Sequence, residues 1–338
     1  SSSCGPGRAR RREVDDVFLP NPEDCRTWIG GAVGALGGWE RIHDLQREML
    51  RDLAETIGGI PADEEIPALG TEEILVAGVS PELRRQIVRL AVIVELTDQA
   101  LERSTTRGVE QYAARLGVRT VLVHEARALA EHHTVLLHTD LLRHSWTAHE
   151  TLHESLSGRL VELVRSKLSY LGVGHDEKIA ARWRGLRDLP EGTWGRGVAD
   201  FYARHGFPFP GERHGIYEIG ARHDFVHVLA GYDATPEGEL DTFALIAATM
   251  PEEQGLTLLA VTLGIFQNGS IRHMMGKRVQ MARSDTLADP GAVRRWIEAF
   301  RRGSDCTVDL MGGVDHFAMA PLPMEEACRR VGLGPARC

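Results

Sequence analysis

The sequence predicts a mainly α-helical protein that is built from two helical domains. Apolar residues recur at spacings of three and four over long stretches, which is the period of an amphipathic helix. Strand-like alternation is scarce, and proline and glycine stand where the helical stretches should begin and end. A chain of 338 residues is long for a single hydrophobic core, which favours two domains.

The first 38 residues are expected to form a flexible amino-terminal segment. They open with SSSCGPGRARRR, which is small, polar and basic and lacks the apolar core of a signal peptide. The basic run from Arg8 to Arg12 could touch anionic lipid, but the alternative is an ordinary solvated tail.

Residues 39–170 are expected to form a helical bundle domain. Its amphipathic segments include QREMLRDLAETI, and Pro81 stands just inside a helix start, after Ser80. The stretch AVIVELTDQALERSTTRGVEQYAARLGV, in which Gly117 follows the end of a helical pattern, resembles the helical tellurite-resistance TerB domains. The acidic turn Thr97-Asp98-Gln99 lacks the glycine usual in that family, so no metal site is carried over from it.

A second domain is expected over residues 180–338, after a boundary near 171–190 where glycine, proline and charge interrupt the helical period. A loop rich in proline and glycine, FYARHGFPFPGERHG, precedes its main helices. Helical patterns follow at 216–231, 239–249, 254–267 and 290–302, and PLPMEEACRRVGL lies near the end.

Composition narrows the class of partner and the compartment. The formal charge of −9 gives no electrostatic reason to expect nucleic acid, so small molecules or proteins are the expected partners. Five cysteines without a CxxC pair provide neither a disulfide framework nor a thiolate zinc site, which fits a cytoplasmic protein. The densest apolar stretch, at 256–266, is about half as long as a bilayer crossing requires.

The segment HDFVH at 223–227 is the first candidate metal site. On a helix, His223, Asp224 and His227 point into one arc of roughly 100°. Gly231 can end this helix, and a tight helical hairpin in the second domain would return Glu239 to the first helix. Two imidazoles with one or two carboxylates suit a catalytic zinc or iron site. The alternative is a pair of hydrogen-bonded histidines at the core edge.

The segment HETLH at 149–153 is the second candidate, because HExxH is the zinc motif of metallopeptidases. His149 and His153 would be the ligands and Glu150 the base. Histidine is common in this region, however, and a third ligand is hard to name among Glu162 and Glu177. A polar helix face is the preferred interpretation.

The stretch HDFVHVLAGYDATPEGE has His, Asp, two residues, His, eleven residues and Glu, and so resembles the coenzyme Q biosynthesis protein 4 family. Upstream, LPEGTWGRGVADFY at 189–202 is similar to the second recurrent motif of that family. Helices corresponding to TLLAVTLGIFQNG, AVRRWIEAFRRG and PMEEACRRVGL also run in the family's order. The resemblance covers roughly residues 180–338, and the amino-terminal bundle lies outside it.

The resemblance implies an all-helical domain in which His223, Asp224, His227 and Glu239 bind a divalent metal. Zinc is the first expectation, with iron, manganese and magnesium as alternatives. The implied activity is the oxidative decarboxylation of a polyprenylated hydroxybenzoate in ubiquinone biosynthesis, with hydroxyl replacing the carboxyl group at ring carbon 1. The implied partners are a prenylated aromatic molecule, other enzymes of the pathway and peripheral contact with a membrane, and a homodimer is the expected assembly.

Four further residues are candidates for catalysis because they flank these motifs. Arg196, near Glu191 in the LPEG–GR stretch, could pair with a substrate carboxylate or instead brace the loop. His214 and Tyr232 could supply a proton, and only their proximity in sequence recommends them. The helices at 242–250 and 256–266 are candidate walls of an apolar groove, although ordinary core packing explains most of their side chains.

Three functions from different classes therefore remain open. The first is the metal-dependent decarboxylase, for which another aromatic acid is an alternative substrate because the amino-terminal bundle is an addition to the family plan. The second is a noncatalytic prenyl-lipid-binding or scaffold protein, which would tolerate the loss of Glu239. The third is a metallopeptidase that works from HETLH.

Overall fold

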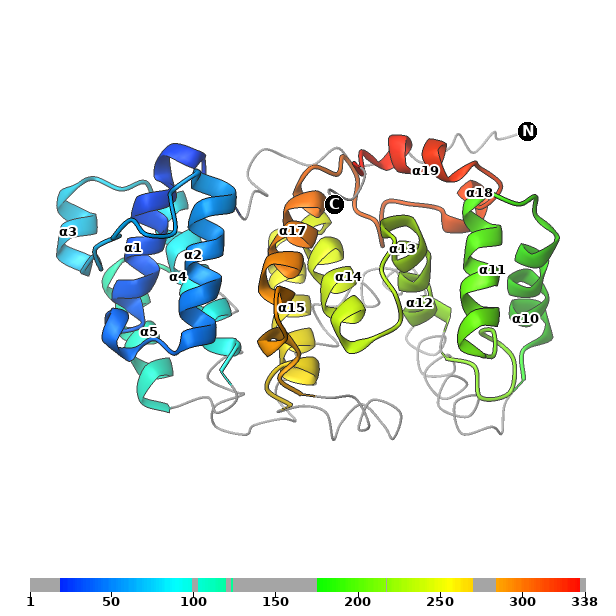
Figure 1. Cartoon of the computed structure of the whole chain (residues 1–338), viewed down its shortest axis with the longest axis horizontal. Coiled ribbons are helices and arrows are strands. Elements are labelled where there is room, and N and C mark those ends of the chain that lie inside the picture. Colours follow the sequence, from blue (N-terminus) through cyan, green and yellow to red (C-terminus); the bar gives the residue numbers. More distant parts are fainter. Residues whose placement is uncertain are drawn as a thin grey trace, which may run out of the picture. The chain divides into compact units, whose positions relative to one another are not determined.

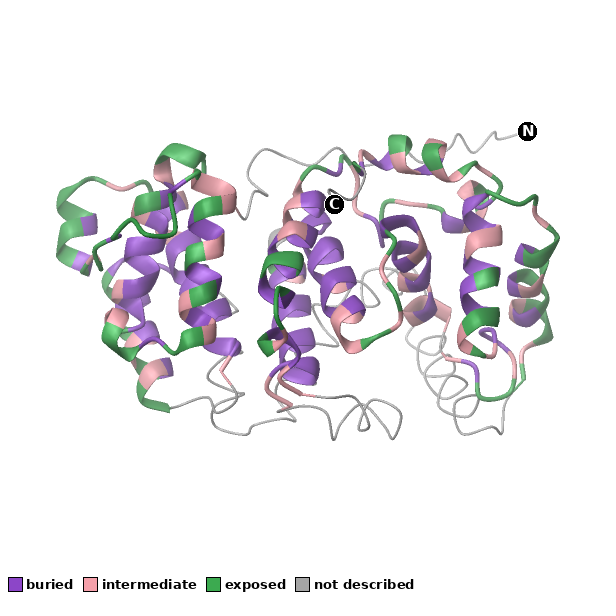
Figure 2. Cartoon of the chain, viewed as in Figure 1, coloured by how far each residue is buried: buried purple, intermediate pink, exposed green. Residues whose placement is uncertain are grey.

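The protein is mainly α-helical, as the sequence predicts (Figure 1). The computed structural model describes residues 19–98, 103–119, 123, 175–216, 218–269 and 284–334. Within these ranges helices are the only regular elements, and extended pairing is limited to one isolated bridge between Thr193 and Pro323. Buried residues lie along one side of amphipathic helices such as α2 (Asp44–Gly58) and α11 (Trp194–His205), with exposed residues on the other side (Figure 2).

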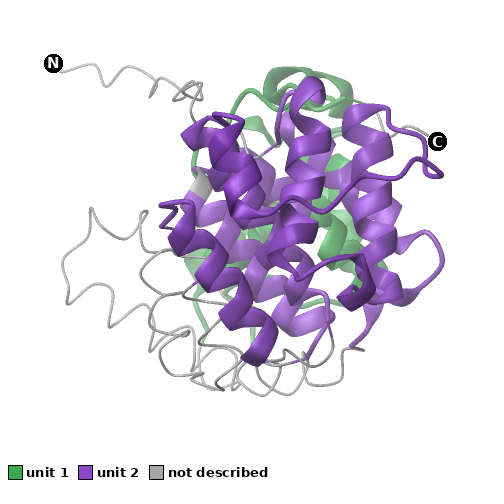
Figure 3. Ribbon diagram, turned by 90° about the vertical axis from the view of Figure 1, so that its left-hand side faces the viewer, with its two compact units in different colours: residues 1–14, 146–242, 305–338 green, residues 15–145, 243–304 purple. Residues whose placement is uncertain are grey.

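Two compact units make up the chain (Figure 3). Unit 1 takes residues 1–14, 146–242 and 305–338, and unit 2 takes residues 15–145 and 243–304. Each unit thus combines segments that are distant in sequence. The domain boundary expected near 171–190 overlaps residues 124–174, which are outside the described ranges, and it stays a prediction.

Unit 2 is a helical bundle with a buried apolar core. Its best-buried side chains include Trp28, Ile87 and Met49, which come from three different helices and are fully shielded from solvent. Its helical elements are η1 (Pro22–Asp24), α1 (Cys25–Ala35), η2 (Trp39–Arg41), α2 (Asp44–Gly58), α3 (Thr71–Val76), α4 (Pro81–Leu96), α5 (Arg103–Arg115), α15 (Glu252–Phe266), η5 (Thr286–Ala288) and α17 (Ala292–Ser304).

Helix α1 corrects the expectation that residues 1–38 are all flexible. Trp28 and Ile29 on this helix have no exposed surface, and the Trp28 indole donates a hydrogen bond to the Gln86 carbonyl oxygen. The glycines of this segment lower its intrinsic helix propensity, so the sequence does not predict the helix. Glycine is required because a Cβ at Gly34 would lie 2.0 Å from the Leu69 carbonyl oxygen.

Helix α4 begins as the sequence predicts. The Ser80 side chain accepts a hydrogen bond from the Leu83 backbone N–H, and Pro81 occupies the first turn. At its other end, side chains that follow α15 bind the last carbonyl groups, with Gln267 Nε2 donating to Thr97 O and Asn268 Nδ2 to Leu96 O. Residues far apart in sequence therefore complete this helix.

Unit 1 is organised around a cluster of aromatic side chains. Trp183 lies 5.4–5.6 Å, between ring centroids, from Tyr202, Phe225 and Phe317. The Trp194 indole donates to the Phe225 carbonyl oxygen and so ties α11 to α13. The elements of unit 1 are α10 (Glu177–Arg184), η3 (Gly185–Asp188), α11 (Trp194–His205), α12 (Glu218–Ala221), α13 (His223–Ala230), α18 (His316–Met319) and α19 (Met324–Val331).

Two helix boundaries in this region differ from the sequence expectation. The helical pattern at 216–231 is divided into α12 and α13, with Arg222 between them. Helix α14 (Pro236–Thr249) begins three residues before Glu239, which was expected to open it, because proline suits the first turn of a helix. The division between the units falls within α14, after Thr242.

The apolar helices at 242–250 and 256–266 contribute mainly to packing. Leu245, Ile246, Leu259 and Leu263 are at most 1% exposed. In the part of the chain that the structure describes, no helix is both long and apolar enough to cross a membrane.

Candidate metal centre

Helix α13 places three potential ligands side by side, as the spacing of HDFVH predicts. His223, Asp224 and His227 each offer one ligand atom, and these atoms lie within 4.8 Å of one another. His227 is completely buried and Asp224 is 5% exposed. The same helix buries Phe225 and Val226 in the core of unit 1, so packing fixes the direction in which the three polar side chains point.

A short turn brings a fourth candidate, Glu239, to the histidines. Helix α13 ends at Gly231, which has the left-handed φ of 78° that favours glycine. Asp233 and Thr235 begin the turn, and the Thr235 hydroxyl accepts from the Gly238 N–H at the start of α14. As a result, Glu239 Oε2 lies 3.4 Å from His223 Nε2 and 3.5 Å from His227 Nε2.

Hydrogen bonds hold both imidazole rings through their Nδ1 atoms. His223 Nδ1 lies 2.5 Å from the Gly220 carbonyl oxygen, which can only accept, so Nδ1 carries the proton. His227 Nδ1 lies 3.0 Å from the hydroxyl of Thr242, one turn beyond Glu239 on α14. The Nε2 atoms of both rings are therefore directed to the carboxylates, which is how proteins orient histidine ligands.

Tyr202 on α11 orients the first carboxylate. Its hydroxyl donates to Asp224 Oδ2, which leaves Oδ1 at 3.4 Å from His223 Nε2. Phe201, the neighbouring residue, stacks on the His227 ring with centroids 5.6 Å apart. Helix α11 thus supports two members of the cluster from outside.

The charged groups of the cluster shift one another's pKa values. Burial opposes a charged His223, but the charges of Asp224 and Glu239 outweigh it and raise the pKa of His223 to about 10. Burial also disfavours a charged Glu239, yet the imidazoles of His227 and His223 hold the pKa of this carboxyl well below its usual range. Burial raises the pKa of Asp224. The cluster thus favours positive charge next to Glu239.

The geometry fits a metal ion better than it fits direct hydrogen bonds. The three nitrogen-to-oxygen distances of 3.4–3.5 Å exceed the usual range of hydrogen bonds. Ligands about 2.0–2.1 Å from a tetrahedral zinc ion are separated by roughly 3.3–3.4 Å. Among the described residues, the buried His227 Nε2 has no hydrogen-bond partner. A ligand set of two nitrogens and two carboxylate oxygens would satisfy that atom.

The four other sequence candidates are not among the potential ligands that converge at this site. Arg196 Nε donates to Asp200 Oδ1 at 2.9 Å, while Glu191 is exposed and contributes a charge near Arg196. His214 is exposed and has a left-handed φ of 66°. Tyr232 is half-buried, directly after the Gly231 cap. Their catalytic roles stay predictions, and the contact between Arg196 and Asp200 lies within α11.

Two residues that support the site, Tyr202 and Thr242, are not identified by any clear pattern in the sequence. Tyr202 is 22 residues from Asp224, and no local spacing connects them. Thr242 has a weak signal, because it lies three residues after Glu239 and so shares its helix face. The competing motif HETLH, with His149, Glu150 and His153, lies outside the described residues, as does Glu162.

The site geometry is the main basis for assigning a function. No model of a known protein family matches the chain, and a search of curated proteins finds no relative of it. The resemblance to the coenzyme Q biosynthesis protein 4 family therefore rests on the quoted motifs and stays a prediction.

Proposed function

We propose that the protein is a metal-dependent enzyme that replaces the carboxyl group of an aromatic acid by hydroxyl. The substrate is a polyprenylated hydroxybenzoate or a related acid of quinone-type biosynthesis. The observation that supports this proposal is the convergence of His223, Asp224, His227 and Glu239, in which three nitrogen-to-oxygen pairs lie 3.4–3.5 Å apart. The motif resemblance supplies the substrate class.

The four residues would hold a divalent ion, for which zinc is the first choice and iron, manganese and magnesium are alternatives. When bound, the ion would polarise a substrate carboxylate or phenolate and stabilise charge that develops as carbon dioxide leaves. The overall conversion takes the acid and water to a phenol, carbon dioxide, two protons and two electrons. A two-electron acceptor, such as dioxygen, must therefore participate.

Residues of the chain would position the reacting groups. Gly220 and Thr242 fix the two imidazoles, and Tyr202 fixes Asp224. His223 and Glu239 retain 13% and 22% of their side-chain exposure, whereas His227 has none. Substrate would therefore approach from the side of Glu239 and His223, where ligand positions can exchange.

Turnover of a carboxyl-labelled substrate tests this proposal. The purified chain, loaded in turn with zinc, iron or manganese, is incubated aerobically with a prenylated 4-hydroxybenzoate carrying ¹³C in its carboxyl group. We expect labelled carbon dioxide and the corresponding hydroquinone by mass spectrometry. Glu239→Gln should lose both products, and Glu237→Gln, a matched change on the same helix, should retain them.

Two other outcomes would contradict the proposed site or the enzyme assignment. Unchanged turnover in Glu239→Gln would place the chemistry elsewhere in the chain. Substrate binding without turnover under all metals, unaffected by Glu239→Gln, would instead support the noncatalytic lipid-binding alternative. Membrane contact, pathway partners and a homodimer belong to the same proposal.

A further inference from the structure

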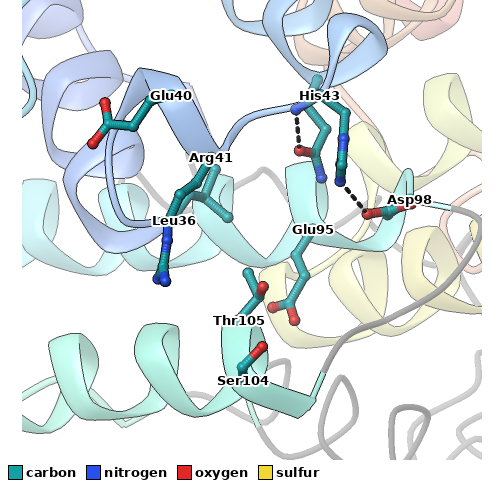
Figure 4. Close-up of a pocket in the computed structure, with 9 residues that line it drawn as sticks. Leu36, Glu40, Arg41, His43, Glu95, Asp98, Ser104 and Thr105 are labelled. Carbon is teal, nitrogen blue, oxygen red and sulfur yellow. Dashed lines mark hydrogen bonds and ion pairs between the residues drawn. The ribbon is translucent and has the colours of Figure 1, made fainter.

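A polar cavity lies within unit 2 and is separate from the metal cluster. Its volume is about 300 Å³, and it is lined by the start of α2, the end of α4 and the start of α5 (Figure 4). Glu95, Ser104 and Thr105 face one another across its lower part (Figure 4). Volumes of this size suit small organic molecules, whereas one water molecule occupies about 30 Å³.

Glu95 is the unusual group in this cavity. The residue is only 2% exposed, and its Oε1 accepts a hydrogen bond from the Thr106 hydroxyl. Its Oε2 is buried and has no hydrogen-bond partner in the part of the chain that the structure describes. A buried carboxylate oxygen without a partner is costly, because folding removes its water without replacing it. A donor placed next to this oxygen would supply the missing hydrogen bond.

The surrounding charges define what kind of donor fits. Asp98 also lines the cavity, and its Oδ2 lies 3.3 Å from His43 Nε2. Burial and the charge of Asp98 raise the pKa of Glu95 to about 7, against the effect of the Thr106 hydrogen bond, so a cation next to it would be favourable. Arg41 lies on the side of the cavity away from Asp98 (Figure 4). Its positive charge disfavours the binding of a bare divalent ion, and its N–H groups suit a hydrogen-bond acceptor on the ligand.

We propose that this cavity binds a small molecule through a protonated amine. Glu95 Oε2 accepts a hydrogen bond from the ammonium group, and the hydroxyls of Ser104 and Thr105 accept others. The ligand is either a simple amine or an amino-acid-like zwitterion whose anionic group approaches Arg41. This site is independent of the metal cluster and of the function proposed for it.

Calorimetric titration of the full chain tests the proposal and separates the two sources of the amine. The probes are ethanolamine and putrescine as simple amines, glycine as a zwitterion, and ethylene glycol as a neutral molecule of similar size. We expect saturable 1:1 binding of at least one amine and none of ethylene glycol. Glu95→Gln should weaken binding at least tenfold, and Glu72→Gln, an exposed residue of the same unit, should not change it.

A second variant keeps the test informative if Glu95→Gln folds poorly. Thr105→Val removes one acceptor while keeping side-chain shape and should weaken amine binding severalfold. The proposal is overturned if no amine saturates, or if neither variant changes amine affinity. Saturable binding of calcium or magnesium that depends on Glu95, without any binding of amines, would also overturn it.

Discussion

At the scale of single residues, the decisive feature of the metal cluster is that the Nδ1 atoms of both imidazoles are already hydrogen-bonded. Gly220 O and Thr242 Oγ1 occupy the Nδ1 atoms of His223 and His227, so Nε2 is the only nitrogen that either ring can present to an ion. Outer hydrogen bonds of this kind raise ligand basicity and restrict ring rotation. Metal affinity should therefore depend on residues that do not touch the ion.

Replacing Thr242 by valine tests this dependence. The variant keeps the side-chain shape but removes the hydroxyl 3.0 Å from His227 Nδ1, so metal affinity should fall by about 10- to 100-fold. Competition with a chromophoric chelator would measure the change. Thr249→Val, the same substitution further along α14, should leave the affinity unaltered, and equal losses in both variants would refute the positioning role.

Glu95 makes a separate prediction about stability and pH. Burial raises the pKa of Glu95 from 4.5 to about 7, so the folded chain retains a proton that the unfolded chain has already released. Stability contributed by this group therefore falls as pH rises from 4.5 through 7, by about 3 kcal/mol in total. Urea unfolding at pH 5 and pH 8 should show this loss in the wild type and not in Glu95→Gln.

The control for the pH prediction is Glu72→Gln, which changes an exposed carboxyl of the same unit. It should retain the wild-type difference between pH 5 and pH 8. A Glu95→Gln variant with the full wild-type pH dependence would show that other groups cause it.

At the scale of elements, the turn between α13 and α14 determines where Glu239 lies. Gly238 is packed against this turn, and a Cβ there would lie only 1.8 Å from the Asp233 carbonyl oxygen. Glu239 follows immediately, so a shift of the helix start moves its carboxylate. The close approach at Gly238 therefore positions the fourth ligand.

The substitution Gly238→Ala should displace the start of α14. We expect a loss of about 1–3 kcal/mol in stability and weaker metal binding, measured by urea unfolding and chelator competition. Gly220→Ala is the matched control, because open space surrounds that position and its carbonyl group remains. If Gly238→Ala bound metal with wild-type affinity, the result would show that Glu239 is not a ligand.

Helices and ligands differ in how far the sequence predicts them. The period of apolar residues predicted α2, α4, α5 and α15, and helix geometry grouped His223, Asp224 and His227. Helix α1 was missed because its glycines are selected by close packing against Leu69 and Ile87, which are distant in sequence. Tyr202 was missed for the same reason, since only the folded α11 brings it to Asp224.

At the scale of the whole molecule, the mainly α class follows from composition and periodicity, but the grouping of helices does not. In unit 2, Arg294 on α17 pairs with Asp52 and Glu55 on α2 across about 240 residues of sequence. Exposed pairs of this kind leave no local pattern in the chain. The membership of each unit therefore had to come from the structure.

Metal analysis of the whole chain tests the central claim most directly, because it decides between HDFVH in unit 1 and HETLH in the undescribed part. Inductively coupled plasma mass spectrometry would compare the wild type with His223→Ala/His227→Ala and His149→Ala/His153→Ala. We predict about one equivalent of a divalent metal, lost only in the first double variant. Loss only in the second would contradict the account and revive the metallopeptidase that HETLH suggests.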